Sequence, residues 1–590
     1  MNSLSDRLTD RVVEALRDRY ALERLPTESD WDSDEPCLYL KIRNAITTPP
    51  KANLGDLAVP CFVLAKELKT SPVHIALELS DAFACDELFV AAAAMGPYLN
   101  VTVDGSILAE DIIEEILEQG ADYGGSVIAE PPAVVVDYSS PNIAKPLGVH
   151  HLRSTMIGNA ICSLYEKRGY RVERVNYLGD WGTQFGKLIT AYSMSSLTGN
   201  STTIENLAYI YAEFCKMAKE DSSLDDKARE WFKRLEDGDK IAVDLWKQFN
   251  LASLAEFKEI YQRLGVSFTQ FDGESNYSQA ALDVVKEAQE KGIAEVGDGG
   301  AIVVPMEGKD PPCMLAKSDG ATTYMARDVA AVIQRYKDHK FEKMLYVVGE
   351  AQALHFKQVF HVVKQLGYDF ADKCHHVPFG LLKFGGAKCS TRKGNMLLLN
   401  DVLDTAADEV AGLVKEKNNQ IDEKTIDQIG VGAVVFADLS RKRINDANFK
   451  WEEILNFDGS TGPYLQYTTA RCFSILDKAA MDLSQDMRTF EDKNYLKGLK
   501  QLKAIEEKRL LLKLQNFGSV LNLATQEFEP SILAQYALGL AKLINKFIHN
   551  CRVIQKDKTL ELARCTLVHC CHLVLSESLR ILGIKPLEKM

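Results

Sequence analysis

An apolar strand, a turn, a helix and a second strand follow one another in residues 133–182, and this order constrains the fold more than any other feature. AVVVDYS reaches a Pro-Asn turn, STMIGNAICSLYEKRGY has helical spacing, and RVERVNYLGDWG is again strand-like. Such a βαβ unit within about fifty residues predicts a parallel sheet.

The rest of the chain surrounds this unit with other patterns. A helical, charge-rich stretch from about 190 to 295 precedes a second α/β half, in which AIVVPM and KMLYVVG bracket a helix. From about residue 400 onward the pattern is almost wholly helical, as in LAQYALGLAKLINKFI. We therefore predict four regions: an α+β domain (1–115), a split α/β domain (116–400, insertion about 190–295), linker helices (401–455) and a helical bundle (456–590).

The composition is that of a folded, multidomain protein. Hydrophobic residues make up 46% and charged residues 26% of the 590, and single cores seldom grow past ~250–300 residues. The N-terminal residues lack a secretory pattern and no run of ~18 apolar residues occurs, so we expect a cytoplasmic protein without a membrane span. The net charge of −14 argues against indiscriminate polyanion binding. A local basic stripe suffices for phosphate contacts, and a solvated helix face explains the candidate stripe equally well: Lys500, Lys503, Lys508, Arg509 and Lys513.

The 13 cysteines favour a packed interior over a disulfide framework, since their number is odd. Two groups invite a zinc interpretation: Cys374-His375-His376, and the cysteines and histidines of LARCTLVHCCHLVL. Neither contains a C-x₂-C pair, and the second is an apolar helical run. We therefore expect core packing and no protein-bound metal.

Positive and hydrogen-bond-donating side chains gather where the first strand meets its helix. Residues 137–155 read DYSSPNIAKPLGVHHLRST. Ligands of open parallel sheets bind beyond the carboxyl ends of the strands, where a helix N-terminus offers free N–H groups to phosphate. Lys145, His150, His151 and Arg153 add to this, which indicates a nucleotide-phosphate site.

These residues also carry a resemblance. SSPNIAKPLGVHHLRSTMIGNA (139–160) and VNYLGDWGTQFGKL (175–188) resemble the catalytic core of the arginyl-tRNA synthetase family. The resemblance spans nearly the whole chain and implies a Rossmann-like class I synthetase domain with a helical insertion, an α+β N-terminal domain that touches the tRNA D-arm, and an all-α anticodon-binding bundle. It implies that arginine is activated by ATP and transferred to the 3′-terminal ribose of tRNA(Arg), with AMP and pyrophosphate released, and that activation needs bound tRNA.

The chain departs from the family at its first ATP motif, His-x-Gly-His. The corresponding residues are Gly148, Val149, His150 and His151, so the first histidine and the glycine are both replaced. The resemblance assigns the ATP phosphates to His151, and we expect His150 to fill the gap from a shifted position.

The second ATP motif of class I enzymes, Lys-Met-Ser-Lys-Ser, corresponds to residues 388–392 in AKCSTRKGNMLLLNDVLD. Taken alone, this segment reads as a solvated loop, but the form ending STRKGN is familiar in the family. Its second lysine is Thr391 here, and the resemblance gives that role to Lys145. The residues expected at ATP are Lys145, His150, His151, Lys388, Ser390, Arg392 and Lys393.

Amino-acid specificity depends on a third cluster. Tyr324 and Asp328, four residues apart at the start of a helix, can share one face. A guanidinium suits a carboxylate and an aromatic face, although an aspartate in a first helical turn is ordinary. The resemblance implies arginine contacts by Ser140, Pro141, Asn142, His151, Tyr324, Asp328 and Gln352, with Asp137 as a distant countercharge.

The C-terminal half of the resemblance concerns tRNA. GSTGPYLQYTTARCFSIL (459–476) is similar to the start of the family's anticodon-binding bundle, and the ending SLRILGIKPLEKM also matches. Tyrosine, glutamine and arginine suit the reading of single-stranded bases. The residues expected at tRNA are Asn100, for the D-arm, and Tyr464, Gln466, Tyr467, Arg471 and Met590.

The sequence therefore predicts a monomeric arginine–tRNA ligase with arginine, tRNA(Arg) and ATP as substrates, the ATP accompanied by Mg²⁺. Two alternatives remain open. One is a synthetase for another amino acid, which the residues at Tyr324, Asp328 and Gln352 argue against. The other is an inactive relative that only binds tRNA, which the altered Gly148–His151 motif would fit.

Overall fold

The computed structural model describes residues 4–20, 38–194, 202–384, 387–388, 397–416, 421–457, 459–479 and 497–590. The chain divides into two compact units. Unit 1 comprises residues 1–123, 472–518 and 540–574, and unit 2 comprises residues 124–471, 519–539 and 575–590. The predicted C-terminal bundle (456–590) is therefore shared between the units, because its long helices begin in one unit and end in the other.

The N-terminal part of unit 1 is an antiparallel sheet with helices, as the α+β pattern predicted. The strand order is β1-β3-β2, and a tight turn at Gly96 joins β2 to β3. Apolar side chains of α1, α4 and α5 are buried. The elements are α1 (Leu4–Tyr20), α2 (Leu38–Ala45), β1 (Leu57–Pro60), α3 (Ala65–Leu68), α4 (Pro72–Ala82), β2 (Phe89–Met95), β3 (Tyr98–Val103) and α5 (Gly105–Gln119).

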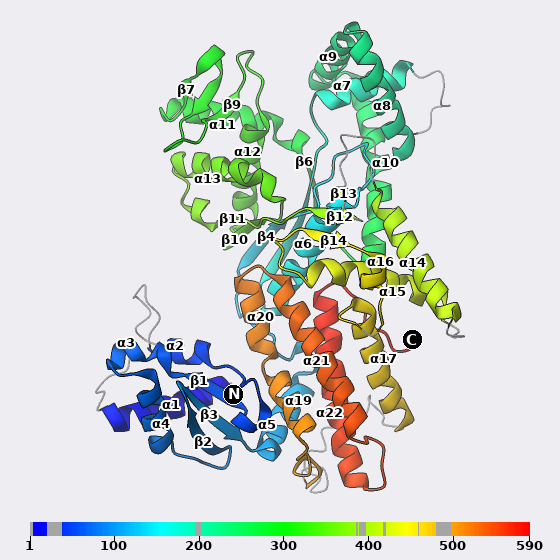
Figure 1. Ribbon diagram of the computed structural model, residues 1–590. Coiled ribbons are helices and arrows are strands. Elements are labelled where there is room, and N and C mark those ends of the chain that lie inside the picture. The colour runs from blue at the N-terminus through cyan, green and yellow to red at the C-terminus, as the bar shows by residue number, and fades with distance from the viewer. Residues whose placement is uncertain are drawn as a thin grey trace. The chain divides into compact units, whose positions relative to one another are not determined.

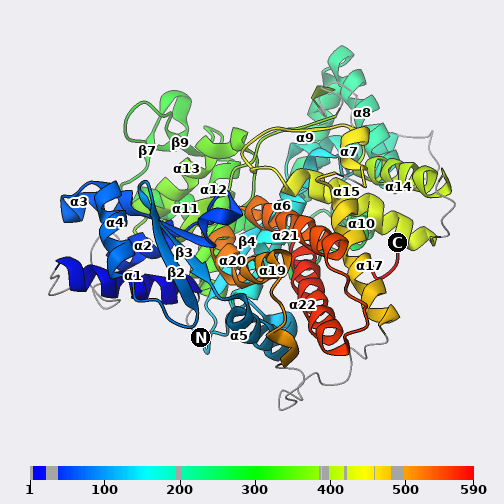
Figure 2. The same ribbon diagram turned by 60° about the horizontal axis from the view of Figure 1, so that its bottom comes forward.

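Helix α19 (Ile505–Gln515) packs against α5 within unit 1, side by side in Figures 1 and 2. Lys508 Nζ lies 2.5 Å from Asp56 Oδ2, and Lys500 Nζ lies 4.0 Å from Glu110 Oε1. Two residues of the candidate basic stripe therefore contact carboxylates of the N-terminal domain.

Unit 2 is built on a five-stranded parallel sheet of order β11-β10-β4-β5-β6. The predicted βαβ unit forms its centre: α6 (His150–Lys167) connects β4 (Ala133–Asp137) to β5 (Arg171–Leu178). All five residues of β4 are buried, as expected for a central strand of a parallel sheet. The remaining strands are β6 (Gln270–Gly273), β10 (Lys343–Tyr346) and β11 (Cys374–His376).

Helices pack on this sheet. Val135, Val175 and Met344 of the sheet share one hydrophobic core with α11 (Ser278–Glu290), α12 (Tyr324–His339) and α13 (Ala353–Gln365). Helix α6 contacts β4 and β5, and α14 (Leu399–Glu416) and α15 (Glu423–Leu439) pack against α6. The arrangement is the Rossmann-like fold that the sequence predicted.

Four helices form an insertion between β5 and β6 (Figure 1): α7 (Thr183–Met194), α8 (Ile204–Glu220), α9 (Ser223–Glu236) and α10 (Lys240–Leu264). The stretch predicted as helical from about 190 to 295 therefore also contains β6, a strand of the main sheet. This short edge strand has the sequence QFDG, which lacks an apolar run and gives no strand signal.

The predicted strand AIVVPM is β8 (Ile302–Val304), but it lies outside the parallel sheet. It forms an antiparallel sheet with β7 (Glu295–Val296) and β9 (Cys313–Ala316). Short loops join these strands, and a short connection suits an antiparallel pair, whereas a parallel neighbour needs a long crossover.

The described residues after β11 are mainly helical. Their elements are β12 (Leu382–Phe384), β13 (Ala387–Lys388), α14 (Leu399–Glu416), α15 (Glu423–Leu439), β14 (Ala447–Phe449), α16 (Trp451–Ile454), α17 (Gly462–Lys478), α20 (Phe517–Gln526), α21 (Pro530–Asn550) and α22 (Lys558–Ile581). The apolar face predicted for α21 is buried at Leu533, Leu540 and Phe547. In α22, Cys565, Cys570 and Cys571 are also buried, as core packing predicted.

Candidate active site

A cavity of about 400 Å³ opens at the carboxyl ends of the central strands of unit 2. Asp137 ends β4, Tyr346 ends β10 and Gly179 directly follows β5, and all three line the cavity. The chain reaches β5 and β10 on opposite sides of β4, so this is the switch point at which open α/β sheets bind ligands. The other lining residues are Ser140, Asn142, Tyr177, Glu274, Tyr324, Asp328, Ala331, Arg335, Val348, Gln352, His355 and Phe356.

Five of the seven residues predicted to hold arginine line this cavity: Ser140, Asn142, Tyr324, Asp328 and Gln352. Tyr324 opens α12 and Asp328 follows about one helical turn later, as their spacing predicts. Gln352 ends the 3₁₀ helix η6 (Glu350–Gln352). Pro141 and His151 are not among the lining residues.

The loop after β4 has a strained backbone. Ser139 and Ser140 have φ values of 71° and 47°, in the left-handed region that residues with a Cβ seldom adopt. Buried hydrogen bonds hold this conformation: Ser139 N–H donates to Ser154 Oγ (2.8 Å), and Ser140 Oγ donates to Asp137 Oδ1 (2.8 Å).

Gly179 leaves the space that the Asn142 amide occupies. A Cβ built on Gly179 would lie 2.3 Å from Asn142 Oδ1. The backbone of Gly179 also accepts a hydrogen bond from Ile143 N–H (3.2 Å) and donates one to Pro141 O (3.1 Å). The GDWG segment therefore positions an amide of the cavity, a role for which a glycine is required.

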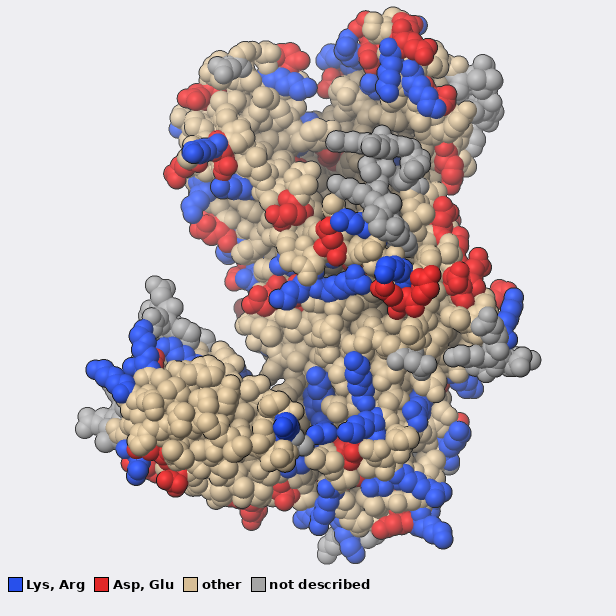
Figure 3. Space-filling model, viewed as in Figure 1, with Lys and Arg blue, Asp and Glu red and all other residues tan. Residues whose placement is uncertain are grey.

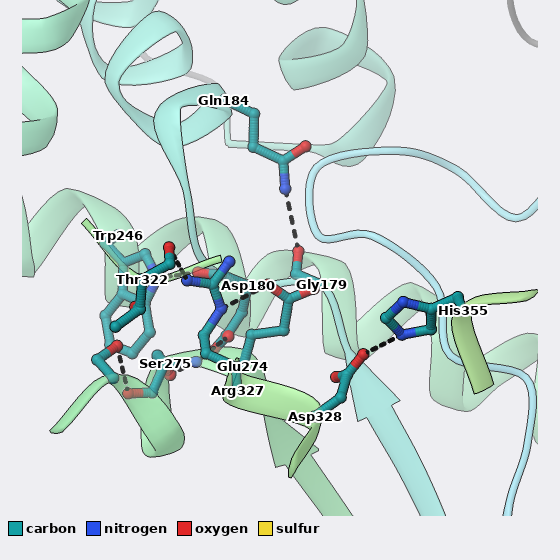
Figure 4. Close-up of polar contacts among 11 residues, drawn as sticks. Gly179, Asp180, Gln184, Trp246, Glu274, Ser275, Thr322, Arg327, Asp328 and His355 are labelled. Atoms are coloured by element: carbon teal, nitrogen blue, oxygen red, sulfur yellow. Dashed lines mark hydrogen bonds and ion pairs between the residues drawn. The ribbon is translucent and has the colours of Figure 1, made fainter. Parts of the chain in front are cut away.

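Asp328 is paired with His355, which the sequence analysis did not identify. His355 Nε2 lies 2.6 Å from Asp328 Oδ2 (Figure 4), and the two side chains are 25% and 21% exposed. His355 belongs to the first turn of α13, three residues after Gln352, and this proximity was the available signal. The contact engages one oxygen of the Asp328 carboxylate.

Glu274, at the start of the 3₁₀ helix η4 (Glu274–Tyr277), adds a second carboxylate that sequence reasoning missed. Burial raises the pKa of Glu274 to about 8, although Arg327 opposes this. Arg327 Nε lies 3.5 Å from Glu274 Oε2 (Figure 4), and its guanidinium lies 4.7 Å from the ring centroid of Tyr324. Glutamate is common and the surrounding segment is polar, so nothing in the sequence singles Glu274 out.

Asp180 holds the segment that carries Glu274. Its carboxylate accepts hydrogen bonds from Ser275 N–H (2.9 Å) and Ser275 Oγ (2.6 Å). Trp246 Nε1 of the helical insertion donates to Asp180 O (2.8 Å), as Figure 4 shows. The motif DWG thus ties η4 to the end of β5.

Asp137 forms a buried ion pair with Arg335. Arg335 Nη1 donates to Asp137 Oδ2 (2.7 Å), and both side chains are less than 5% exposed. The Arg335 guanidinium lies 4.9 Å from the ring of Tyr177 and 5.9 Å from that of Tyr346. The hydroxyls of these two tyrosines are buried without a hydrogen-bond partner within the described residues. They are polar atoms of the cavity that a ligand can satisfy.

The altered ATP motif lies at the N-terminus of α6. Helix α6 begins at His150, whose ring centroid is 4.0 Å from that of His151. Gly148 N–H donates to His151 Nδ1 (3.1 Å). Burial, then the neighbouring His150, lower the pKa of His151 to about 3, so its ring is neutral. Burial also lowers the pKa values of His150 and Lys145.

The segment that follows the second predicted ATP motif is hydrogen-bonded to the first motif. Val149 N–H donates to Leu397 O (2.9 Å), and Leu399 N–H donates to Leu147 O (2.8 Å). Ser390, Arg392 and Lys393 lie outside the described residues, and Lys388 is described only as part of strand β13. The end of the motif segment is thus hydrogen-bonded to the loop that precedes α6.

The residues predicted to contact tRNA differ in exposure. Tyr467 is 44% exposed, and Tyr464, Arg471 and Met590 are half-buried. Gln466 is fully buried, and its Nε2 donates to Gln428 O (3.1 Å) and Lys585 O (2.9 Å). A tRNA contact by Gln466 does not fit this structure, because the amide serves the protein interior. Asn100, on β3, is only 5% exposed and offers little surface to a D-arm.

Two features are absent from the described ranges. No group of three or more His, Cys, Asp or Glu side chains is arranged there to hold a metal ion. No helix in the same ranges combines the length and apolar character that a membrane crossing requires.

Comparisons with known proteins agree with this geometry. Three family models match: "Arginyl tRNA synthetase N terminal domain" at residues 7–103, "tRNA synthetases class I (R), catalytic domain" at 112–451 and "DALR anticodon binding domain" at 465–590. Arginine–tRNA ligase 2 of Bacillus anthracis is 40% identical over 554 residues, and arginine–tRNA ligase of Clostridium botulinum is 42% identical over 554 residues. Each alignment covers 93% of this chain and 96% of the relative. The arginyl-tRNA synthetase structures from Thermus thermophilus (24% identity) and Plasmodium falciparum (22% identity) share the fold, each with a TM-score of 0.78 over 100% of both chains.

Proposed function

The chain belongs to the arginyl-tRNA synthetase family, and from this premise we propose that the 400 Å³ cavity of unit 2 binds the arginine that it charges onto tRNA. ATP is the second substrate. The observation that carries the proposal is the pair of carboxylates, Glu274 and Asp328, beside the ring of Tyr324. A planar cation that accepts an aromatic face and charge-assisted hydrogen bonds suits such a set.

The guanidinium of arginine is bound at α12. Asp328 has one oxygen engaged by His355 and offers the other. Glu274 Oε2 and Arg327 Nε make no hydrogen bond in the described structure, so a ligand donor has a buried acceptor available at Glu274. A bound cation stabilises the ionised form of Glu274, which burial disfavours in the empty cavity.

The backbone end of arginine lies toward the loop after β4. Ser140, Asn142 and Gln352 supply neutral hydroxyl and amide groups on that side of the cavity. Such groups can bind an ammonium and a carboxylate without neutralising either. This leaves the substrate carboxylate available as a nucleophile, and His151 and Pro141 support the loop that presents it.

ATP is bound at the N-terminus of α6. The free backbone N–H groups of a first helical turn favour phosphate, and His150, His151 and Lys145 add donors there. Lys388, Ser390, Arg392 and Lys393 complete the triphosphate site, and Mg²⁺ accompanies ATP to offset its charge. The carboxylate oxygen of arginine attacks the α-phosphorus and pyrophosphate leaves; the ribose hydroxyl of tRNA then attacks the carbonyl carbon and AMP leaves.

The tRNA is bound by residues outside this cavity. Tyr464, Tyr467, Arg471 and Met590 of unit 2 and Asn100 of unit 1 remain candidates, Asn100 only with a rearrangement that exposes it. Figure 3 shows Lys and Arg side chains gathered over the C-terminal helices, although the chain as a whole carries a net charge of −14. Such a local basic surface is what phosphate contacts require.

We propose a monomer, to be tested by light scattering coupled to gel filtration. The residues that line the arginine cavity all belong to unit 2. A cytoplasmic location fits an enzyme that uses tRNA and ATP.

The test is charging of tRNA(Arg) with labelled arginine by the full chain and by Asp328→Asn. Loss of a charged partner of a buried cation raises KM for arginine roughly 100-fold and leaves KM for ATP nearly unchanged. Asp372→Asn is the matched control, because Asp372 pairs with Lys364 at the surface of the same unit. Equal arginine KM values for the two variants would refute the assignment of the cavity, and tRNA binding without charging by the wild type would identify an inactive relative.

A further inference from the structure

A second cavity, of about 420 Å³, opens in unit 2 away from the arginine cavity. Its lining comes from the segment before β4, the C-terminal end of α6, the start of β10 and helix α20. All of these residues belong to unit 2. They are Ser126, Ile128, Tyr165, Arg168, Tyr170, Lys343, Asn522, Thr525 and Gln526.

The second cavity lies at the end of β10 opposite the arginine cavity, and at the end of α6 opposite the altered ATP motif. Helix α6 has His150 at its first position and Arg168 as its C-cap; its 18 residues span about 27 Å. Strand β10 begins with Lys343 in the second cavity and ends with Tyr346 in the first. The second cavity is therefore at the amino ends of the parallel strands and is separate from the arginine and ATP sites.

The charged residues that line the second cavity are all positive. Arg168 and Lys343 line it, and no carboxylate is among its lining residues. Neighbouring arginines are compensated: Arg171 pairs with Glu173 at 3.1 Å, and Arg174 pairs with Glu166 at 2.8 Å. Half-buried cations are normally paired, because desolvation of a charge is costly.

Arg168 is held in place without being neutralised. Among the residues that the structure describes, its Nη1 donates one long hydrogen bond, to Gly124 O at 3.5 Å. Burial lowers the pKa of Arg168, and no carboxylate contributes to the shift. An anion in this cavity would supply the missing partner for the guanidinium.

Apart from Ile128, the remaining lining residues carry neutral donors and acceptors. Tyr165 and Tyr170 stand edge to face with their ring centroids 5.1 Å apart, and α20 contributes Asn522, Thr525 and Gln526. Guanidinium, ammonium, amide and hydroxyl groups together form the donor set that binds phosphate oxygens. A carboxylate ligand would use fewer of these donors than a phosphate does.

We infer that this second cavity is a binding site for a phosphate group, with Arg168 and Lys343 as its cationic ligands. The phosphate belongs either to a small phosphorylated molecule or to the backbone of bound tRNA, and both sources present the same oxygens. The inference concerns a site that the proposed function does not require.

The first arm of the experiment measures binding of inorganic phosphate to the full chain by isothermal titration. Arg168→Gln and Lys343→Gln are expected to weaken binding about tenfold or more, as the loss of a charge-assisted hydrogen bond does. Arg168→Lys, which keeps the charge, is expected to restore part of the affinity. Lys286→Gln is the matched control, since the side chain of Lys286 is exposed and pairs with Glu290 on the same helix, α11.

The second arm measures tRNA affinity at several salt concentrations. If the phosphate belongs to tRNA, Lys343→Gln lowers the slope of log K against log salt by about 1, and Lys286→Gln does not. A change in either arm that is specific to Arg168 and Lys343 supports the site. Behaviour like Lys286→Gln in both arms overturns it.

Two controls separate this result from other failures. Thermal unfolding identifies a variant that does not fold. If Arg168→Gln does not fold, Lys343→Gln still tests the site, because Lys343 is only half-buried. Arginine charging by the wild type is measured in parallel, so a failure of the proposed function is seen independently of phosphate binding.

Discussion

We expect Glu274 to couple arginine binding to pH. Burial raises its pKa to about 8 in the empty cavity, so at neutral pH the carboxyl group is largely protonated. A guanidinium beside it favours the ionised form, and binding therefore releases a proton below about pH 8. Since the complex holds fewer protons than the empty protein, arginine affinity rises with pH and levels off above about pH 8.

Calorimetry in buffers of different ionisation enthalpy measures the proton release directly. We expect close to one proton near pH 7 for the wild type and none for Glu274→Gln, which also binds arginine roughly tenfold or more weakly at pH 8.5. Undiminished proton release in Glu274→Gln would assign the titration to another group.

Glu274 also affects folding stability. Its folded pKa is raised above the unfolded value, so the stabilising contribution is complete below about pH 4.5 and is lost as pH rises through about 8. We expect the free energy of unfolding of Glu274→Gln, relative to that of the wild type, to be higher at pH 9 than at pH 6. Chemical denaturation without substrates measures both values. The same difference at both pH values would contradict the shift.

At the scale of elements, the N-terminus of α6 gives a test of the predicted ATP motif. His150 and His151 are the first two residues of the helix, and their rings are adjacent. We expect His150→Gly to raise KM for ATP about tenfold, because a phosphate donor is lost. The double variant Gly148→His, His150→Gly recreates the family order His-x-Gly-His and is expected to recover most of that loss in pyrophosphate exchange. If the double variant is no better than His150→Gly, the two positions are not interchangeable donors.

The junction between β5 and the loop after β4 gives a second prediction at this scale. Gly179→Ala puts a methyl group where a Cβ is 2.3 Å from Asn142 Oδ1, so the amide is displaced from the cavity. KM for arginine is expected to rise about tenfold or more, with KM for ATP less affected. Gly349→Ala is the control, because the nearest heavy atom to its Cβ is Phe379 at 3.9 Å. Equal effects of the two substitutions would argue against a positioning role for Gly179.

At the scale of the whole molecule, hydrogen bonds connect α17 to residues near the C-terminus that are distant from it in sequence. Gln466 binds the backbone of Gln428 and Lys585, and Thr469 Oγ1 donates to Leu587 O (3.2 Å). Residues 585 and 587 are thus held by hydrogen bonds to α17.

This role predicts a stability effect. Gln466→Ala removes the two hydrogen bonds that the buried amide donates, to Gln428 O and Lys585 O, and is expected to cost about 1–3 kcal/mol of unfolding free energy. Gln535→Ala is the control, since Gln535 donates to a single carbonyl, Ser440 O, from an exposed position (2.7 Å). Denaturation followed by circular dichroism measures both. If Gln466→Ala had unchanged stability and weaker tRNA binding, Gln466 would have to be assigned to the tRNA-binding surface.

The sequence by itself determined the fold class, and with the family resemblance it predicted five residues that line the 400 Å³ cavity: Ser140, Asn142, Tyr324, Asp328 and Gln352. Hydrophobic periodicity predicted the βαβ core, and helical spacing brought Tyr324 and Asp328 to one face, because both depend on residues close together in the chain. The edge strand β6 and the separate sheet of β8 were missed, since short strands depend on partners distant in sequence.

Only the tertiary structure decided which charges are available. Asp137 is neutralised by Arg335, Asp328 is shared with His355, and Glu274 enters the cavity from a segment without any motif. Gln466 matched the tRNA-binding pattern and is buried, while Arg168 and Lys343 matched no pattern and line a cavity together. The physical reason is the same in each case: burial and pairing fix the state of a polar group, and both are set by residues that meet only after folding.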